Sequence, residues 1–547
     1  INFYYLPKSM SFNTEMYRFN SEKLMRNKSH GLVNIRPTFS RQWDWSRNYQ
    51  FRYDLTRALS FEYSAQAQAY IYEPAGNPDK GTSEWKANQD TIKQELRDLG
   101  SMSRFQQTIN SSYTLPINKI PLFDWVNAST NYQGTYFWTA SAQSVQARLG
   151  NQIENSNTIQ ANGNLDFTKL YNKVPYLKTI NSAPSGNRNA KAQNKGNNKG
   201  NVQDSTNVKP RVNVGKQVLD NTLRLLMLVR KASLTYSMNN GQNLPGFLQE
   251  PNYFGMNGLS WAPGVGFVLG SNEDIFQRAI DNGWLTRDSI LSEPFRRNST
   301  QTLNYRINAE PLQNFRIDVS GNRTYAENFQ EYFRANKFGE FKTFTPTNGG
   351  NFSMSYLMWN TSFTPAGKGD SNDSPLFDNL LEYRKIIAKR IAENNPQWMQ
   401  NVQSYEYDSL AGDFFPWGYG SASTEVVMYS FIAAYTGQNP NTMSLSPFPK
   451  IPLPNWTITY TGLSNVPALS KIFKSISINH SYRSSYAISS WASNVYYNES
   501  NTIQTFENSH LIIPKYDISQ MVLSEQYAPL IGFELGFQNT MTCNLQY

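Results

Sequence analysis

The chain has 547 residues, a mass of 62.6 kDa and a formal net charge of +9, with 17% charged and 14% aromatic residues. A soluble chain of this length would divide into several domains and carry more charge, so the composition disfavours an ordinary soluble protein. No apolar run approaches the roughly 20 residues that a membrane-spanning helix needs, which excludes a helical membrane protein. The lone Cys543 excludes an intrachain disulfide. The scattered Lys and Arg residues disfavour a nucleic-acid partner.

Alternation of apolar and polar residues is strict from Leu59 onward. The odd positions from Leu59 to Ile71 are apolar, and the even positions from Ser60 to Tyr70 are mostly polar. Successive side chains of a strand point to opposite faces, so this segment predicts a strand with one apolar and one polar face. The run exceeds the roughly 9–11 residues that a tilted strand needs to cross a bilayer. We expect barrel strands with a short helical insertion over residues 1–180.

One segment occurs twice, as IPLFDW at 120–125 and as IPLPNW at 451–456. In each copy, prolines mark a corner and a tryptophan opens the next predicted strand. Tryptophan prefers the membrane–water boundary, where its ring is buried and its N–H stays hydrated. Trp125 and Trp456 are therefore candidate membrane-interface residues. A coincidental turn motif is the alternative.

Residues 181–214 differ from the segments on either side. They are rich in Asn, Gly and Lys and contain almost no apolar side chains. Such a stretch cannot bury enough surface to fold, which predicts a disordered loop. We expect barrel strands and loops again over 215–373. There a loop around 244–257 is a candidate for gating or partner binding, through Leu244, Pro245, Gly246 and Phe247.

A hairpin is predicted within this second region. Apolar residues alternate with Asn and Arg from Leu303 to Ala309, and alternation resumes from Phe315 to Val319. The intervening segment contains Pro311, which cannot donate to a strand ladder. Shorter alternating runs occur at 352–356, 456–460 and 476–478. Alternation over 531–537 and 541–547, around a turn at 538–540, predicts a last hairpin within the strand region 451–547.

Residues 374–450 predict a mainly helical insertion. Ser374 and Pro375 are start signals for an amphipathic helix, and Pro396 stops it. This helix could rest on a barrel rim or on a partner, but packing against the chain's own loops is favoured. Residues 425–435 are apolar nearly all round and precede Gly437, which predicts a buried helix in a loop domain or in the lumen. Weaker helix patterns occur at 87–99 and 274–281.

These patterns together predict an all-β fold, an antiparallel transmembrane β-barrel with a few short helices in loops or lumen. A soluble β-sandwich or propeller also alternates apolar and polar residues. The long strands, and the contrast of short turns with very long connections, favour an outer-membrane barrel. At about 30–40 residues per strand and connection, the chain would supply roughly 12 to 18 strands.

Sequence motifs for catalysis are missing. His30, His480 and His510 lie far apart and lack metal-ligand spacing, and no P-loop or nucleophile elbow occurs. We therefore expect neither an enzyme nor a bound metal or cofactor.

Several segments, in order, resemble the outer-membrane translocon of the type IX protein secretion system, the SprA/Sov family. They are LPKSMSF (6–12), YRFN (17–20), DFTKLYNKVPYL (166–177), LPGF (244–247), WAPG (261–264), GWLT (283–286), and AEP (309–311) with FRID (315–318). Each motif is weak alone, but together they cover essentially the whole chain. Members of this family are several times longer, so we expect these residues to be one part of a very large barrel.

The resemblance implies a protein-conducting channel in the outer membrane of a Gram-negative bacterium, with a link to gliding motility. It implies secreted cargo proteins with a C-terminal signal domain, a smaller outer-membrane shuttle barrel and a periplasmic plug as partners, besides membrane lipid and lipopolysaccharide. The alternating strands suggest Arg306, Asn308, Arg316 and Asp318 as lumen-facing residues. A ligand-gated outer-membrane nutrient transporter is the alternative function, and an adhesive surface protein a further one.

Overall fold

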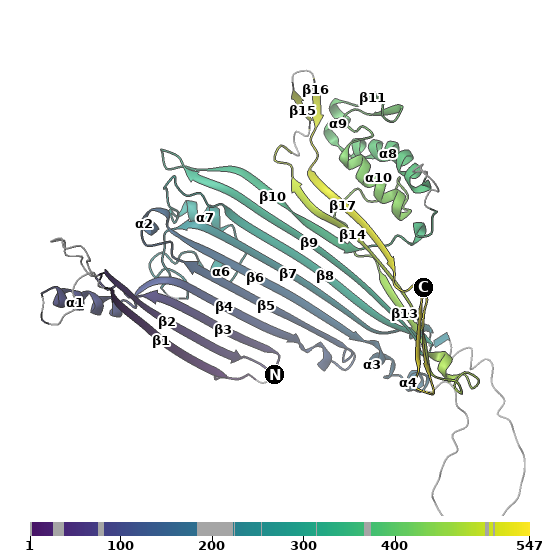
Figure 1. The fold of residues 1–547 in the computed structure, drawn as a ribbon, viewed down its shortest axis with the longest axis horizontal. Coiled ribbons are helices and arrows are strands. Elements are labelled where there is room, and N and C mark those ends of the chain that lie inside the picture. Colours follow the sequence, from purple (N-terminus) through teal and green to yellow (C-terminus); the bar gives the residue numbers. More distant parts are fainter. Residues whose placement is uncertain are drawn as a thin grey trace, which may run out of the picture.

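A computed structural model describes residues 3–23, 25, 38–74, 81, 83–182, 222–223, 225–252, 254–312, 314–365, 374–497, 503–506 and 509–547. One antiparallel sheet of 15 strands dominates it (Figure 1). These strands are β1 (Ser9–Lys23), β2 (Thr38–Asp54), β3 (Leu59–Tyr70), β4 (Ser101–Leu115), β5 (Val126–Thr139), β6 (Asn151–Asp166), β7 (Val229–Phe247), β8 (Phe295–Leu312), β9 (Phe315–Ala335), β10 (Phe341–Ser355), β13 (Asn455–Tyr460), β14 (Phe473–Ser493), β17 (Tyr516–Tyr527), β18 (Gly532–Phe537) and β19 (Thr542–Gln546).

The remaining elements are short. Two further hairpins pair β11 (Tyr405–Asp408) with β12 (Asp413–Pro416) and β15 (Ile503–Phe506) with β16 (Ser509–Ile512). The α-helices are α1 (Ser83–Arg97), α2 (Gln146–Leu149), α3 (Phe167–Tyr171), α4 (Pro175–Ser182), α6 (Val265–Val268), α7 (Ile275–Asp281), α8 (Pro375–Asn394), α9 (Pro396–Asn401) and α10 (Thr424–Thr436). The prediction of a mostly antiparallel β fold with few helices is confirmed.

Strands β1 to β10 pair in sequence order, each antiparallel to the next. Within the described residues the sheet is open, because β1 and β19 lie at its two edges. The 15 strands fall within the predicted number. A closed barrel is not formed by this part of the chain, so the very large barrel remains a prediction.

One strand of the sheet is interrupted by the helical insertion. Strands β10 and β13 both lie between β9 and β14, and residues 356–454 connect them. The insertion leaves and returns at one point, where Leu453 N donates to Ser355 O at 3.0 Å and Ser355 Oγ donates to Leu453 O at 2.6 Å. The segment predicted as a helical insertion, 374–450, lies within these residues.

The helices predicted within this insertion are confirmed. Helix α8 begins at Pro375, and α10 ends at Thr436, directly before Gly437, whose φ of 67° is left-handed. Ile387 of α8 packs with Met428 and Ile432 of α10 in one buried cluster. The preference for packing against the chain's own residues is therefore confirmed. Helices α1 and α7 occupy the two weaker helix patterns.

Both predicted hairpins are confirmed. In the first, Ala309 pairs with Ile317 and Leu312 with Phe315, and a register irregularity lies between the two pairs around Pro311. In the second, β18 pairs with β19.

Two other expectations need correction. The loop predicted at Leu244, Pro245, Gly246 and Phe247 is wrong, because these residues form the end of β7 and are buried. Leu244 and Phe247 are apolar and pack into the largest core cluster, which fixes them in the sheet. The contrast of short and long connections also holds only in part, because the long connection 167–228 leaves the same end of the sheet as the short turn 55–58. Of the predicted disordered segment 181–214, residues 181 and 182 end α4, and the remainder lies outside the described residues.

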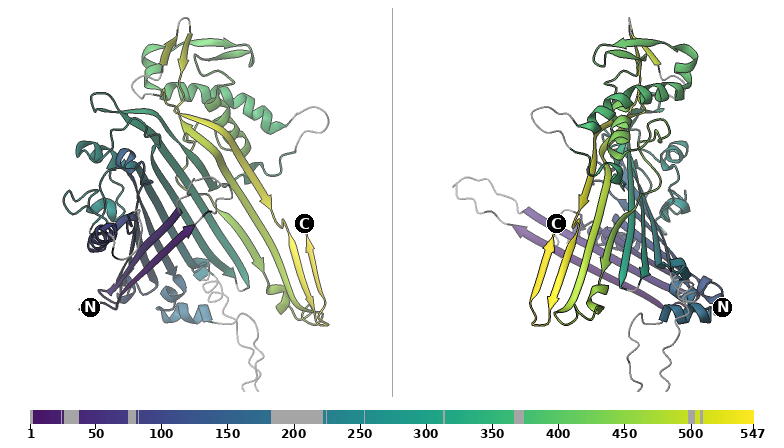
Figure 2. Two further views of the ribbon diagram at one scale, coloured as in Figure 1. Left: turned by 60° about the vertical axis from the view of Figure 1, so that its left-hand side comes forward. Right: turned by 90° about the vertical axis from the view of Figure 1, so that its right-hand side faces the viewer.

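The sheet is curved. In both views of Figure 2 its outer strands bend toward one side, and helices α6 and α7 lie on the opposite side. We call the side that carries α6 and α7 the convex face and the other side the concave face.

Candidate membrane-facing band and polar concave face

Strand pairing assigns every residue of the sheet to one of the two faces. Directly paired residues of antiparallel strands point to the same side, and sequence neighbours point to opposite sides. Gln107 of β4 and Asn155 of β6 bond to the backbone of α6 and its following residues, so their side of the sheet is the convex face. One pairing row on that face contains Tyr53, Phe61, Ser111, Tyr132, Ile159, Met238, Gln301, Tyr325, Phe352, Ile488 and Met521.

The adjacent row lies on the concave face and differs in chemistry. It consists of Arg52, Glu62, Asn110, Gln133, Thr158, Asn239, Thr300, Ala326 and Asn351. Hydroxyl, amide and charged side chains thus replace most of the aromatic and aliphatic ones. The two faces of the same strands are suited to different surroundings.

Over β3 to β8 the lower half of the convex face is mainly apolar and mostly exposed. Other parts of the chain reach its margins, where Tyr132 Oη donates to Leu269 O at 2.6 Å and Tyr305 Oη donates to Pro452 O at 3.2 Å. Leu234 is 51% exposed, Phe61 43% and Ile159 38%. None of the residues that form this surface, the bare band, carries a charge. They are Leu59, Phe61, Ser111, Tyr113, Leu115, Val126, Ala128, Thr130, Tyr132, Ile159, Ala161, Gly163, Leu165, Ala232, Leu234, Tyr236, Met238, Gln301, Leu303, Tyr305, Ile307 and Ala309.

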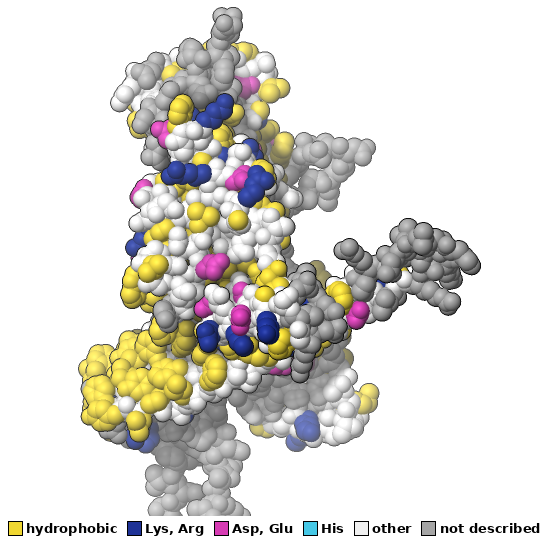
Figure 3. All heavy atoms as spheres, turned by 90° about the vertical axis from the view of Figure 1, so that its left-hand side faces the viewer, with side chains coloured by type: hydrophobic (Ala, Val, Ile, Leu, Met, Phe, Trp, Pro, Cys, Tyr) yellow, Lys and Arg dark blue, Asp and Glu magenta, His cyan; other side chains and the backbone are white. Residues whose placement is uncertain are grey.

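The bare band continues toward the β1 edge as a dense hydrophobic patch (Figure 3). Met10, Phe12 and Phe51 of this region are all exposed. A contiguous apolar surface of this kind marks contact with a membrane or with a partner. Its extent over β5, from Val126 to Tyr132, is about 20 Å at about 3.3 Å per residue.

Residues 248–294, the connection between β7 and β8, cover the upper half of the convex face. Phe267 and Val268 of α6 pack on Tyr136, Trp138 and Ile153 of the sheet in one buried cluster. Polar sheet residues beneath it donate to its carbonyls. Gln107 Nε2 lies 2.8 Å from Val268 O, and Asn155 Nδ2 lies 3.1 Å from Phe267 O and 2.8 Å from Ser271 O.

The concave face opposite the bare band is hydrophilic throughout. Its residues there are Ser60, Glu62, Asn110, Ser112, Thr114, Asn127, Ser129, Asn131, Gln133, Thr158, Gln160, Asn162, Asn164, Ser233, Thr235, Ser237, Asn239, Thr302, Asn304, Arg306 and Asn308. Most of these side chains are uncharged. Such a surface is suited to contact with water.

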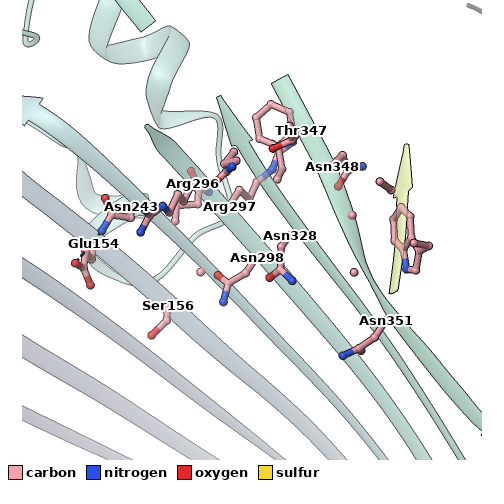
Figure 4. A pocket seen from close by; sticks show the side chains of 18 of the residues that line it. Glu154, Ser156, Asn243, Arg296, Arg297, Asn298, Asn328, Thr347, Asn348 and Asn351 are labelled. Atoms are coloured by element: carbon pink, nitrogen blue, oxygen red, sulfur yellow. Dashed lines mark hydrogen bonds between the residues drawn. The ribbon is translucent and has the colours of Figure 1, made fainter. Parts of the chain in front are cut away.

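A polar cavity of about 850 Å³ opens on the upper part of the concave face (Figure 4). Glu154, Asn243 and Arg296 come from the neighbouring strands β6, β7 and β8, and Asn328 comes from β9. Glu154 Oε1 accepts from Asn243 Nδ2 at 2.8 Å. The cavity is thus an amide-rich recess in the wall of the concave face.

The four candidate lumen residues lie together on the concave face, at the lower end of β8 and β9. Asp318 is the centre of the group: its carboxylate lies 3.6 Å from Arg306 and 2.9 Å from Arg316, and it accepts a hydrogen bond from Asn308. Both arginine side chains are more than half exposed.

The two candidate interface tryptophans lie near one pairing row. Trp125 directly precedes β5, its Nε1 donates to Leu122 O at 2.9 Å, and its ring lies 5.2 Å from that of Phe167. Trp456 is in β13 and stacks on Tyr482 at 4.3 Å. The row that starts beside Trp125 contains Val126, Leu165, Ala232, Ile307, Val319, Trp456, Tyr482 and Tyr527.

The part of the chain that the structure describes contains neither a metal site nor a membrane-spanning helix. No group of three His, Cys, Asp or Glu side chains there could hold a metal, and no helix there is both long and apolar enough to cross a bilayer. His480, in β14, contacts Leu530 O through Nδ1 at 2.6 Å.

No protein-family model and no curated protein matches the chain. Among solved structures, CdiB from Acinetobacter baumannii is similar at 7% identity and a TM-score of 0.17, over 97% of this chain and 61% of that one. A mutant of the ferric enterobactin receptor PfeA from Pseudomonas aeruginosa matches at 8% identity and a TM-score of 0.19, over 89% and 64%. The chain thus spans less than two thirds of the length of either. At such scores the likeness carries no argument about fold or function.

The sequence did not predict that polar residues of the sheet would bond to the 248–294 segment. Gln107, Asn155 and Gln242 interrupt apolar alternation, so each resembled a polar outer position. Their partners lie at least 30 residues away in the sequence, including Asn272 Oδ1 and Glu273 O, to which Gln242 Nε2 donates. Only the position of the 248–294 segment on the sheet reveals their role.

Proposed function

We propose that this chain is part of the wall of a wide β-barrel in the outer membrane of a Gram-negative bacterium. The bare band faces the hydrocarbon of the bilayer, and the concave face lines an aqueous passage. The observation that supports this most strongly is the uncharged, uncovered band that stands opposite a continuous hydrophilic surface on the same strands. A soluble sheet would need to cover such a band, because exposed apolar area is unfavourable in water.

The passage conducts proteins in this proposal. A surface dominated by Ser, Thr, Asn and Gln stays hydrated and lets a folded polypeptide slide past. The resemblance of the sequence motifs to the type IX translocon supports secreted proteins with a C-terminal signal domain as cargo. It also supports the shuttle barrel and the periplasmic plug as partners. The protein itself performs no covalent chemistry in this proposal.

The orientation of the wall is tested with Leu234 and Thr235, which are adjacent in β7 and face opposite sides. In full-length protein carrying Cys543→Ser, we expect a hydrophilic maleimide to label Thr235→Cys in intact outer membranes and to leave Leu234→Cys unlabelled. A lipophilic maleimide should reverse this preference. Equal labelling of both positions by the hydrophilic reagent would contradict a membrane-facing band.

The cargo is tested with a photo-crosslinking residue at Asn239 of the concave face. We expect it to capture secreted proteins in transit, whereas the same residue at Met238 of the bare band should capture lipid. Capture of a small nutrient alone at Asn239 would favour the transporter function and contradict protein conduction.

A further inference from the structure

An apolar groove lies on the convex face of β1 to β4, at the upper margin of the bare band. It has a volume of about 850 Å³, and Phe12, Tyr49, Phe51, Phe61 and Ile109 are among its walls. The hydrophobic patch visible in Figure 3 lies on the same edge of the molecule.

A second cavity of about 530 Å³ adjoins the groove. Tyr49, Tyr63 and Phe254 line both, so the two form one continuous depression. The second cavity differs in that Arg47 and Arg97 line it. The depression therefore has an apolar part and a cationic part.

Arg47 is buried without an ion-pair partner. It is 3% exposed, and its Nε has no hydrogen-bond acceptor. No ion pair within the described residues involves it, and its guanidinium carbon lies 4.9 Å from the Trp45 ring centre. Asp98 and Glu250 also line the cavity, but both are exposed. A buried, unpaired charge is strongly unfavourable, and an anion that bonds to it removes that penalty.

Phe254 supplies a wall that the sheet does not. It belongs to the covering segment 248–294, is 65% exposed, and lies with its ring centre 5.9 Å from that of Tyr63. Its φ of 49° is uncommon for an aromatic residue. An exposed ring held in this conformation, over the junction of the two cavities, is positioned to contact an apolar ligand.

We propose that this depression binds one anionic membrane lipid, with its phosphate at Arg47 and an acyl chain in the groove. The site rests on the proposed membrane function, because the groove opens on the surface that faces the bilayer. Lipid is the occupant that matches both parts: a free phosphate leaves the groove empty, and an apolar protein segment leaves Arg47 unpaired.

The test uses the full-length protein in nanodiscs of phosphatidylcholine, with lipid A as the probe and native mass spectrometry as the readout of bound lipid. We expect Arg47→Gln to weaken lipid A binding about tenfold or more, because a charge-assisted contact is lost. Arg52→Gln is the matched control, since Arg52 lies in the same strand but on the concave face. Phe12→Ser, at an exposed groove position, should also weaken binding.

Three outcomes would overturn the lipid site: unchanged binding to Arg47→Gln, equal binding of dephosphorylated lipid A, or full competition by inorganic phosphate. If Arg47 has only a structural role, Arg47→Gln should raise the melting temperature of the protein, and lipid A should still stabilise the variant. If Arg47 binds the lipid phosphate, lipid A should no longer stabilise the Arg47→Gln variant. Wild-type protein that stays monodisperse without detergent or nanodisc would instead contradict the membrane function itself.

Discussion

The convex face of the sheet has two regions that are carried by the same strands. On β6, Ile159, Ala161 and Leu165 belong to the bare band, whereas Asn155 and Asn157 lie under the 248–294 segment. The bare region contains one amide, Gln301, and several hydroxyl groups among its apolar side chains, whereas amides in the covered region donate hydrogen bonds to the covering segment. Side-chain amides are therefore concentrated on this face where the covering segment supplies their acceptors.

The covering segment benefits from the same bonds. A helix leaves its last carbonyls without partners in the helix, and the short helix α6 ends at Val268. Gln107 Nε2 donates to Val268 O, Tyr132 Oη to Leu269 O at 2.6 Å, and Asn157 Nδ2 to Gly270 O. These side chains of the sheet thus satisfy carbonyls at and just after the end of α6.

The largest effect is expected from a charge placed in the bare band. Leu234→Arg should destabilise the protein by about 2–4 kcal/mol, because the guanidinium would enter hydrocarbon. Thr235→Arg, on the concave face of the same strand, should change stability little. Urea unfolding of both variants in lipid vesicles measures the difference. Equal tolerance of the two substitutions would show that the band does not face lipid.

Close approach of the covering segment is tested at Gly134. A Cβ added there would lie 2.1 Å from the backbone oxygen of Leu269, which cannot move independently. We expect Gly134→Ala to displace the 248–294 segment and to destabilise the protein by about 1–3 kcal/mol. Limited proteolysis of that segment, together with urea unfolding, provides the measurement.

Gly163 is the matched control, since it lies in the bare band with no atom within 4 Å of an added Cβ. Gly163→Ala should be neutral or should stabilise the strand. If Gly134→Ala leaves the segment as protease-resistant as the control does, the segment does not contact the sheet as described.

The amides under the segment predict an effect of similar size. Asn155→Leu makes this position as apolar as the bare band, but it removes one hydrogen bond from the carbonyl of Phe267 and one from the carbonyl of Ser271. We expect a loss of about 1–3 kcal/mol in the free energy of unfolding. Asn164→Leu, at an exposed concave position of the same strand, should stay within about 0.5 kcal/mol. A stabilising Asn155→Leu would show that burial, and not hydrogen bonding, determines this region.

The smallest stability effect is expected on the concave face. Asp318→Asn removes the ion pairs to Arg306 and Arg316, which are solvent-exposed, so stability should change by about 0–1 kcal/mol. The two arginines then remain without their carboxylate, and the passage should shift toward anion selectivity. Reversal potentials in planar bilayers measure this shift. An unchanged selectivity would show that these residues do not line the conducting passage.

Much of the sheet was predictable because strand formation depends on local alternation. The apolar side of the segment from Leu59 and the hairpin at Pro311 follow from residue spacing alone. The candidate lumen residues shared a face for the same reason, since alternate positions on paired strands point together. The Leu244–Phe247 segment was misassigned because proline and glycine usually indicate a loop, whereas here burial against Trp284 and Ile153 keeps the segment in the strand.

The sequence by itself determined the strands, their alternating faces and the helices of the insertion, because each depends on neighbours within a few residues. Tertiary structure decided which apolar residues are covered and which are bare. On β6, Ile153 and Ile159 are similar apolar residues at alternate positions of the same face, yet Ile153 is fully buried and Ile159 is 38% exposed. Tertiary structure also left Arg47 buried without an ion-pair partner, because its environment comes from separate strands and from the segment 248–294. Such long-range contacts have no signature in local sequence.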